Sequence, residues 1–360
     1  MGRISQIQNI ILKIHQQISE STNAPGLVMI SLSAIALGAA IGGSLPLISL
    51  WMETFNISFQ RIGIVCGISA LGIVCSAYFA PRFATKYGFV LTINIGLIIA
   101  AITSVAFRFT DNYAFWLLLR FVCGLGLGLH WVLTEAWLAS IVKENYRTRV
   151  MAIYAIAMSI GFAVGPIVIW VFGALSVIPF LIIGSLLVLS ILPIAKLKGH
   201  EPKSSNSHKA SPLILIRKAP TVASACIVVG SVDLAMISLL PAMITRTPEA
   251  APILAFIIVP AMAIGATILQ YPVAILADQY GLRKIGVITA SVGLLFASLI
   301  PFFLSSIFIT LLFAFLGACL VYALYTIRFA MLYKRFSGSH IVAANAGFVI
   351  LFDLSMFIGL

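Results

Sequence analysis

Eleven long apolar stretches account for nearly all of the chain after residue 22, and short polar gaps separate them. A helix needs about 20 apolar residues to cross the hydrocarbon core of a bilayer, and the stretches have about that length. Only 9% of the residues are charged, whereas soluble domains carry about 25%, so a surface that faces water throughout is excluded. The sequence predicts an all-α, polytopic membrane protein with spans at 25–50, 61–81, 89–107, 113–142, 150–173, 175–195, 219–245, 251–276, 285–303, 305–333 and 339–360.

The positions of Lys and Arg predict the orientation of the chain. With a cytoplasmic N-terminus, 17 of the 22 basic residues lie on the inner side. Arg61, Arg108 and Arg246 lie on the outer side, while Arg120 and Arg328 lie inside apolar stretches. This bias follows the positive-inside rule, so we expect a multi-pass protein of the cell (inner or plasma) membrane with a cytoplasmic N-terminus. Aromatic anchors are typical of membrane interfaces, and three tryptophans fall at predicted outer ends: Trp51, Trp116 and Trp170.

The polar segments divide the chain into parts. Residues 1–22 predict an amphipathic helix at the membrane surface, because isoleucines recur at helical spacing; a coiled-coil seam is the alternative. The polar stretch 198–218 predicts a cytoplasmic linker. It separates an N-terminal six-helix bundle, 23–197, from a C-terminal bundle, 219–360, which has five spans.

The two halves repeat each other. Gly88 follows the second span and Gly281 follows the eighth, while Arg120 lies in the fourth span and Arg328 in the tenth. Each pair occupies corresponding positions six spans apart. Repeated six-span halves are a known transporter design.

Two loops resemble the signature of the major facilitator superfamily. The run AILADQYGLRK at 274–284 has Asp278, Gly281, Arg283 and Lys284 in the positions of that signature. The first-half copy, PRFATKYG, keeps Lys86 and Gly88 but has Thr85 where an acid is expected. The resemblance implies that these residues gate the inner side of the protein; a simple positive anchor is the alternative.

Further motifs extend the resemblance over nearly the whole chain. LLLRFVCGLGLG at 117–128 is similar to an arginine-centred motif of the fourth span, and GFAVGP at 161–166 resembles the Gly-Pro motif of antiporters in this family. The run TEAWLAS at 134–140 is similar to a YcaD-like branch. The resemblance implies a two-bundle fold with twelve spans, so we expect the twelfth to be missing. It also implies that Arg120 faces a central cavity and takes part in proton coupling.

Ionisable side chains inside the spans are candidate functional groups. An arginine near mid-membrane costs about 3 kcal/mol or more, so it needs a wet cavity or a partner. The proton-coupling candidates are Arg120, Glu135, Asp233 and Asp353; structural salt bridges or hydrogen bonds are the alternative. The predicted substrate cavity is mixed in charge and does not specify the solute, and its candidates are Ser44, Trp131, Tyr325, Arg328 and Asn345.

These observations predict a secondary active transporter for a small organic solute that works by alternating access. We favour proton-coupled export over proton-coupled uptake or facilitated diffusion, because the span-4 and span-5 motifs resemble antiporters. A membrane enzyme is disfavoured, since the five histidines are scattered and no catalytic motif is present; a receptor is disfavoured by short outer loops. We expect a monomer whose partners are the solute, protons and lipid. Neither a cofactor, a metal nor a nucleic-acid partner is expected, because the cysteines lack metal-binding spacing and the charges lie in short gaps.

Overall fold

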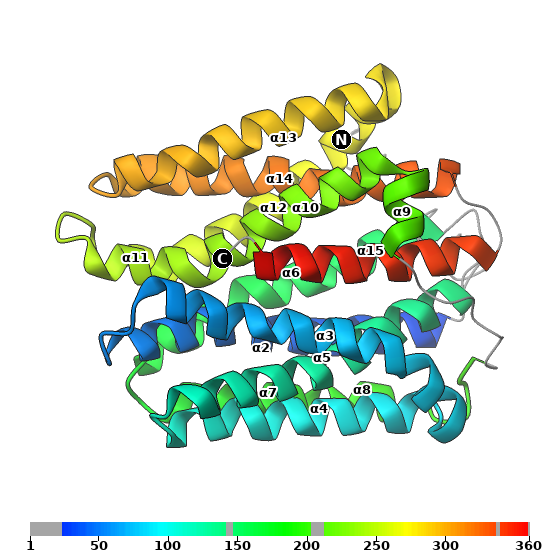
Figure 1. Ribbon diagram of the computed structural model, residues 1–360, viewed down its shortest axis with the longest axis horizontal. Helices are drawn as coiled ribbons and strands as arrows, with labels where there is room; N and C mark the ends of the chain where they lie inside the picture. Colours follow the sequence, from blue (N-terminus) through cyan, green and yellow to red (C-terminus); the bar gives the residue numbers. More distant parts are fainter. Residues whose placement is uncertain (1–23, 142–146, 203–211, 336–338, 359–360) are drawn as a thin grey trace, which may run out of the picture.

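The computed structural model describes residues 24–141, 147–202, 212–335 and 339–358 (Figure 1). Within these residues all regular structure is helical. The first half contains α2 (Ala24–Glu53), α3 (Phe59–Tyr87), α4 (Phe89–Ala106), η1 (Phe107–Phe109), α5 (Tyr113–Ile141), α6 (Arg147–Phe172), α7 (Ile178–Leu189) and α8 (Ile191–Ala195). The second half contains α9 (Pro212–Lys218), α10 (Pro220–Leu234), η3 (Ala235–Leu239), α11 (Leu240–Arg246), α12 (Leu254–Tyr280), α13 (Leu282–Leu299), η4 (Ile300–Phe303), α14 (Ile307–Arg335) and α15 (Ser339–Ile358).

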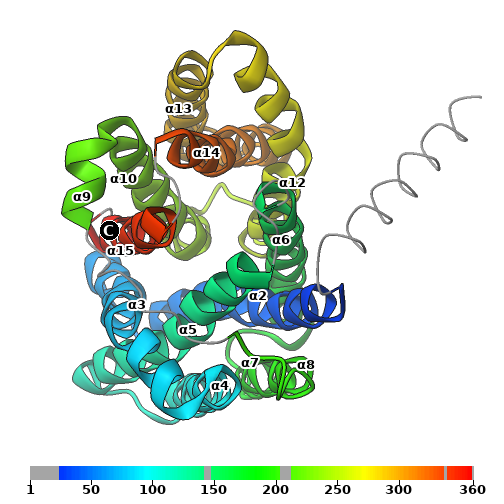
Figure 2. The ribbon, with the colours of Figure 1, turned by 90° about the vertical axis from the view of Figure 1, so that its right-hand side faces the viewer.

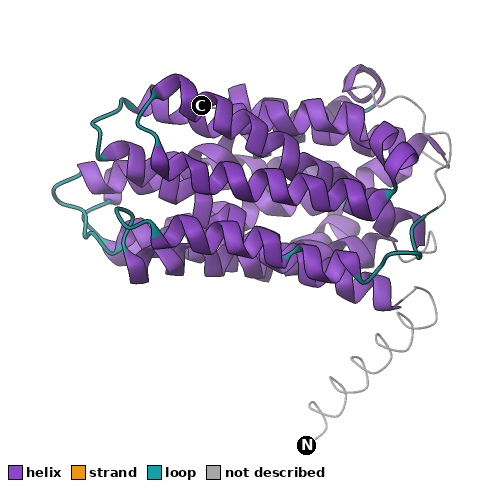
Figure 3. Cartoon of the chain, turned by 90° about the horizontal axis from the view of Figure 1, so that it is seen from below, coloured by secondary structure: helices purple, strands orange, loops and turns teal. Residues whose placement is uncertain are grey.

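The helices confirm the predicted all-α polytopic fold. Among the described residues, nine segments are long and apolar enough to cross a membrane, and two shorter apolar helices, Leu254–Ile268 and Gly347–Met356, lie within α12 and α15. Each of the eleven predicted stretches therefore corresponds to a helix or a broken helix. The long helices run side by side and most of their loops gather at two ends (Figure 3). The surface helix predicted for residues 1–22 lies outside the described residues.

The predicted linker differs from the structure at its C-terminal side. Residues 212–218 form α9, which packs against α10 and α15. Leu215 of α9 is fully buried in an apolar cluster with Val222, Cys226 and Phe352. The helix forms because the run PLILIRK is largely apolar and begins with a proline, which is favoured in the first turn of a helix.

The helices form two bundles that meet along two helix pairs. α6 of the first half packs against α12 of the second half, and α3 packs against α15. Figure 2 shows both pairs end on. We call the end where α2 and α11 finish the Glu53 end, and the opposite end, where α3 gives way to α4, the Gly88 end.

Small residues let neighbouring helices within the first bundle approach closely. A Cβ atom on Gly161 of α6 would lie 2.1 Å from the carbonyl oxygen of Ile35 in α2. A Cβ atom on Gly124 of α5 would lie 2.0 Å from the carbonyl oxygen of Ser69 in α3. Since lipid supplies no hydrophobic force between helices, such close van der Waals packing stabilises the bundle.

The two loops of the internal repeat have the same backbone geometry. Gly88 has a φ of 86° and Gly281 a φ of 100°, so both occupy a region that favours glycine. Each glycine donates its N–H to a carbonyl oxygen in the last turn of the preceding helix, Ala84 or Ala277, and the next helix begins one residue later. The two loops therefore correspond to each other in backbone geometry as well as in their position in the repeat.

The tryptophans at the Glu53 end differ from the sequence prediction. Trp51 and Trp116 are buried, with exposed fractions of 8% and 1%, whereas Trp170 is 58% exposed. Phe55 packs edge-on against both buried tryptophans, and Phe107 stacks on Trp116. Two of the three predicted interface anchors therefore form an internal aromatic cluster, because neighbouring aromatic rings of α2, η1 and α5 enclose them.

Candidate functional site

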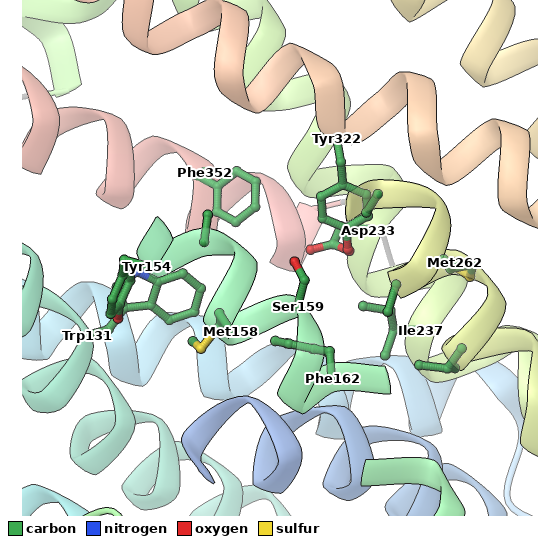
Figure 4. A pocket seen from close by; sticks show the side chains of 14 residues that line it. Trp131, Tyr154, Met158, Ser159, Phe162, Asp233, Ile237, Met262, Tyr322 and Phe352 are labelled. Carbon is green, nitrogen blue, oxygen red and sulfur yellow. The ribbon is translucent and has the colours of Figure 1, made fainter. Parts of the chain in front are cut away.

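A cavity of about 110 Å³ lies between the two halves of the protein (Figure 4). Helices α5 and α6 of the first half line one side, and α10, η3, α12, α14 and α15 of the second half line the other. The space is sufficient for several water molecules, but it is smaller than the roughly 300 Å³ or more of a typical ligand pocket. The lining residues are Trp131, Tyr154, Ala155, Met158, Ser159, Phe162, Asp233, Ile237, Val259, Met262, Ala263, Ala266, Tyr322 and Phe352.

Among the lining residues that the structure describes, Asp233 is the only acidic one, and none is Lys, Arg or His. It lies at the end of α10 and is 8% exposed. The hydroxyl of Tyr322 in α14 donates a hydrogen bond to its Oδ1 atom. Ser159 of α6 points into the same space from the opposite half (Figure 4). The carboxylate is thus held by a neutral partner at the interface of the halves.

A break in the seventh span follows Asp233 directly. The α-helical pattern of α10 ends at Leu234, and η3 is a five-residue π-helical segment before α11 begins at Leu240. Pro241 in the first turn of α11 has no N–H to donate to Ile237 four residues earlier. π-Helical turns are rare and often occur at functional sites. Here the turn contributes Ile237 to the cavity wall.

Trp131 and Glu135 are adjacent on one face of α5. The indole Nε1 of Trp131 donates a hydrogen bond of 2.9 Å to Glu135 Oε1. Trp131 lines the cavity, and Glu135, one turn further along the helix, is only 3% exposed. The structure therefore brings together three of the predicted site residues, since Trp131, Glu135 and Asp233 all lie in or directly behind the cavity wall.

Arg120 lies inside the first bundle and is absent from the cavity lining. Its guanidinium donates to Ser69 Oγ of α3 at 3.0 Å, and its side chain is 3% exposed. Gly124 and Gly128, which share its face of α5, pack against α3 at Ser69 and Ser76. In this conformation the face of Arg120 therefore looks toward α3, because two glycines allow that helix to approach. Its role in proton coupling stays a prediction.

Two further candidates are buried away from the cavity. Ser44 of α2 donates its hydroxyl to the carbonyl oxygen of Ile41 in its own helix. Asp353 of α15 is 2% exposed and follows the lining residue Phe352 in the chain. The side chains of four other candidates lie outside the described residues, although their backbones belong to α12, α14 and α15: Asp278, Tyr325, Arg328 and Asn345.

The loop at Gly88 obtains a carboxylate from a distant segment. Thr85, which stands where the family signature has an acid, donates its hydroxyl to the carbonyl oxygen of Pro81. Glu201, beyond α8, instead accepts the N–H of Phe89 at 2.6 Å and so caps the first turn of α4. Sequence reasoning missed Glu201, because it lies 112 residues away along the chain and has no local signal. The other predicted gating residues are solvent-exposed on their helices: Lys86, Arg283 and Lys284.

An ion pair links the two halves at the Glu53 end. The Nε atom of Arg246 in α11 donates to Glu53 Oε1 in α2. A second guanidinium nitrogen donates to the carbonyl oxygen of Ile57 at 2.6 Å, and the guanidinium carbon lies 4.0 Å from the centre of the Phe59 ring. The sequence indicated Arg246 as an outer residue but missed Glu53. A usable signal was present, because these residues end the first and seventh spans, which correspond in the repeat.

His130 is one of the five scattered histidines, to which we assigned no site role from the sequence. It is fully buried in α5, and its Nε2 atom lies 2.8 Å from the hydroxyl of Ser33 in α2. Ser33 donates that hydroxyl to the carbonyl oxygen of Ser190 at the end of α7. Ser33 therefore accepts the Nε2–H of His130, and the chain of hydrogen bonds joins three helices of the first bundle.

Two bundles of membrane helices that pack together around a largely apolar cavity with a buried carboxylate are typical of a secondary transporter. Comparison with known proteins agrees with this class. The model of the Major Facilitator Superfamily matches residues 30–360. The chain belongs to the Major Facilitator Superfamily.

Relatives and solved structures are consistent with this membership. The chain is 27% identical to the MFS-type transporter YfkF of Bacillus subtilis over 78% of this chain and 71% of that protein. It is 22% identical to the MFS-type transporter YcaD of Salmonella enteritidis over 94% and 88% of the two chains. Its fold is similar to the nucleoside transporter NupG, with a TM-score of 0.75 at 16% identity over 93% and 89% of the chains. It is also similar to a bacterial homologue of the lysosomal transporter Spinster, with a TM-score of 0.70 at 16% identity over 92% and 79%.

The comparisons support the transporter class and its YcaD-like branch. The family match and the relatives are consistent with a multi-pass membrane protein that carries small solutes. The relatives and the structural neighbours are transporters.

Proposed function

We propose that this protein is a proton-coupled exporter of a small organic solute, working by alternating access through the cavity between α6 and α12. The observation that carries this proposal is Asp233, a buried carboxyl group in the wall of the interdomain cavity. An ionisable residue inside a membrane protein is costly and generally marks a solute or proton pathway. The alternatives to this proposal are proton-coupled uptake and facilitated diffusion.

Access to the cavity requires the two bundles to move relative to each other. A cavity of about 110 Å³ does not admit most metabolites without such a movement. The Glu53–Arg246 pair joins α2 to α11, so it holds the bundles together at the Glu53 end. With the basic loops in the cytoplasm, we propose that this is the outer end and that the pair closes an outer gate. Opening that gate breaks the pair, which makes it a component of the alternating-access cycle.

Asp233 is the proposed proton carrier. Its charge can be neutralised by a proton in one state of access and released in the other. The described titratable and charged groups near it are Tyr322 from α14 and Tyr154 from α6, with Glu135 of α5 behind Trp131 and Asp353 of α15 next to Phe352. Asp353, Glu135 and Arg120 are further proton-coupling candidates. Export is favoured by the similarity of the Gly-Pro run in α6 to antiporter motifs.

We further propose a membrane, an orientation and an oligomeric state for the protein. The excess of Lys and Arg on the Gly88 side favours the cell membrane, with the N-terminus, linker and gating loops in the cytoplasm. The protein then acts as a monomer in lipid, with one cavity per chain. Lys86, Gly88, Asp278, Gly281, Arg283 and Lys284 form the inner gate in this arrangement.

Transport in reconstituted vesicles tests the proposal. The purified chain is placed in liposomes with a pH-sensitive dye inside, and solutes from a broad panel are added with and without a pH gradient. We expect solute movement coupled to proton movement in the wild type. Asp233→Asn removes the charge and abolishes gradient-driven transport, while the matched control Asp111→Asn, at an exposed loop position, leaves it unchanged.

Two results contradict the proposal. Solute flux that is indifferent to the pH gradient refutes proton coupling and favours facilitated diffusion. Gradient-driven flux that is the same in Asp233→Asn and in the wild type assigns the proton to another residue.

A further inference from the structure

We propose that the solute is a small organic cation, held between the carboxylate of Asp233 and the aromatic walls of the cavity. This inference rests on the proposed transport function and names the chemical class of its substrate. Two independent properties of the cavity carry it: the sign of the charge in its lining and the number of aromatic faces that surround that charge.

The described lining has a single charge type. Among its fourteen described residues Asp233 is acidic, and none is Lys, Arg or His. Arg120, an intramembrane arginine whose side chain is described, donates to Ser69 inside the first bundle. Arg246 donates to Glu53 at the end of the protein. An anion entering this cavity meets a carboxylate that no described lining residue compensates, whereas a cation neutralises it.

The cavity also has an aromatic enclosure. Five of the lining residues carry aromatic rings and come from four different helices, so they surround the space from both halves (Figure 4): Trp131, Tyr154, Phe162, Tyr322 and Phe352. The faces of such rings are electron-rich and attract cations, with Trp the strongest. Enclosure of a positive head group by several aromatic rings is the chemistry that recognises ammonium groups.

Glu135 strengthens this arrangement as a positioning residue. It accepts the indole N–H of Trp131 at 2.9 Å from within the same helix. The hydrogen bond fixes the ring against the cavity, and a carboxylate acceptor draws the positive edge of the indole toward itself and away from the space. Glu135 therefore orients the electron-rich face of Trp131 without lining the cavity.

The polar groups of the cavity favour a cation over a neutral polyol. Hydroxyl-rich solutes need several directed donors and acceptors. Of the described lining side chains, only four offer oxygen atoms: Ser159, Tyr154, Tyr322 and Asp233. Most of the remaining lining is aliphatic or contains the flexible thioethers of Met158 and Met262. Methionine adapts to irregular apolar groups, so the cavity fits a charged nitrogen with an apolar substituent.

Cation binding at Asp233 explains how coupling arises. A carboxylate that holds the ammonium group in one step cannot hold the proton in the same step. The proton and the organic cation therefore exchange on one group, and no covalent bond is made or broken. This is the competition that an antiporter requires.

Binding to the full-length chain in detergent tests the inference separately from transport. Three probes share a phenyl ring on a short alkyl chain and carry a positive, a neutral or a negative polar group: phenethylammonium, 2-phenylethanol and 3-phenylpropanoate. Binding is measured by calorimetry and by the rise in the thermal unfolding midpoint. We expect the cation to bind the wild type at least about tenfold more tightly than either other probe, which corresponds to about 1.4 kcal/mol.

Variants assign the preference to the named residues. Asp233→Asn removes the preference for the cation, whereas Asp111→Asn retains it. Trp131→Leu weakens cation binding about tenfold and leaves binding of 2-phenylethanol within about twofold, while Trp131→Phe restores most of the cation preference, because it keeps an aromatic face. Equal or tighter binding of the alcohol or the anion by the wild type overturns the inference, even if no variant folds.

The failure of this inference is distinguishable from that of the proposed function. Proton-driven flux of neutral or anionic solutes overturns the substrate class and leaves proton-coupled transport standing. Selective cation binding without any cation flux in vesicles supports the site and contradicts transport.

Discussion

The Glu53–Arg246 pair provides a quantitative test of alternating access, since it joins the bundles at only one end of the molecule. The perturbation is a double-mutant cycle of Glu53→Gln, Arg246→Gln and the double variant. Their side chains are 18% and 33% exposed, and solvent-exposed pairs contribute roughly 0.2–1 kcal/mol. Arg246 also donates to the Ile57 carbonyl and lies over Phe59. We therefore expect a coupling energy at the upper end of that range, about 1 kcal/mol.

This energy acts on the conformational equilibrium, because the pair exists only when the Glu53 end is closed. A loss of about 1 kcal/mol shifts the ratio of closed to open molecules about fivefold. The shift is measured by electron spin resonance distances between labels on Asp111→Cys and Glu249→Cys, which are exposed loop positions of the two halves at this end. Four of the five native cysteines are buried, and Cys75 is replaced by Ala in the background.

We expect a longer-distance population to grow in Glu53→Gln and Arg246→Gln and not to grow further in the double variant. Raising the salt concentration lengthens the wild-type distances toward those of the variants, because screening weakens a partly exposed pair. Distance distributions that are identical in the wild type and Glu53→Gln, or single-variant effects that simply add, refute the assignment of this pair as a gate.

Three further perturbations test the packing and the loops, each measured as the thermal unfolding midpoint or half-life of the purified protein. Gly161→Ala places a Cβ atom 2.1 Å from the Ile35 carbonyl oxygen, so it separates α2 from α6 and lowers stability by about 1–3 kcal/mol; an unchanged midpoint contradicts that packing. Glu201→Ala removes the acceptor for the Phe89 N–H and costs about 1 kcal/mol, whereas Glu249→Gln at an exposed loop is neutral within about 0.5 kcal/mol. Gly281→Ala adds a Cβ atom to a backbone with a φ of 100°. It lowers the free energy of unfolding by about 1 kcal/mol or more, even though no atom lies within 4 Å of the added Cβ. An unchanged stability means that the loop relaxes.

The sequence was sufficient for the features that depend on local pattern. Apolar length alone located the spans, because lipid demands a continuous apolar helix. Gly88 and Gly281 were recognisable as a repeated loop, because only a few residue types adopt their positive φ angles. Asp233 and Trp131 were recognisable because polar and aromatic groups stand out within an apolar segment.

The orientation of each helix face was not readable from the sequence. In α6, Met158 and Phe162 line the cavity, while Ile156 and Ile160 are 40% and 49% exposed on the outside of the bundle. Both faces are apolar, because lipid and the interior of the protein are similar solvents, so hydrophobic periodicity gives no contrast. The expectation that Arg120 faces the cavity came from the family resemblance. In the structure Arg120 donates to Ser69 of α3, and two glycines on its face of α5 pack against that helix.

Contacts between distant segments were also beyond sequence reasoning. Glu53 meets Arg246 across 193 residues and Glu201 meets Phe89 across 112. Glu53 and Arg246 each look like an ordinary charge at the end of a span, and only the alignment of the two halves indicates that they correspond. Glu201 has no such signal, because its partner is the backbone N–H of Phe89.

The alternative to a transport role is that the buried charged side chains only stabilise the helix bundle. Their hydrogen-bond partners distinguish the two roles. A structural salt bridge cancels two charges and favours one conformation. Among the hydrogen bonds of the described residues, Asp233 accepts from the neutral Tyr322 and Arg120 donates to the neutral Ser69, while the one ion pair in that part of the chain, Glu53–Arg246, lies at the end of the protein. The cavity carboxylate therefore keeps a charge that a proton or a cation can neutralise, whereas the ion pair lies at the end where we propose that the protein opens. Alternating access requires both features: a carboxylate in the cavity that a ligand can neutralise, and an ion pair between the bundles that can break.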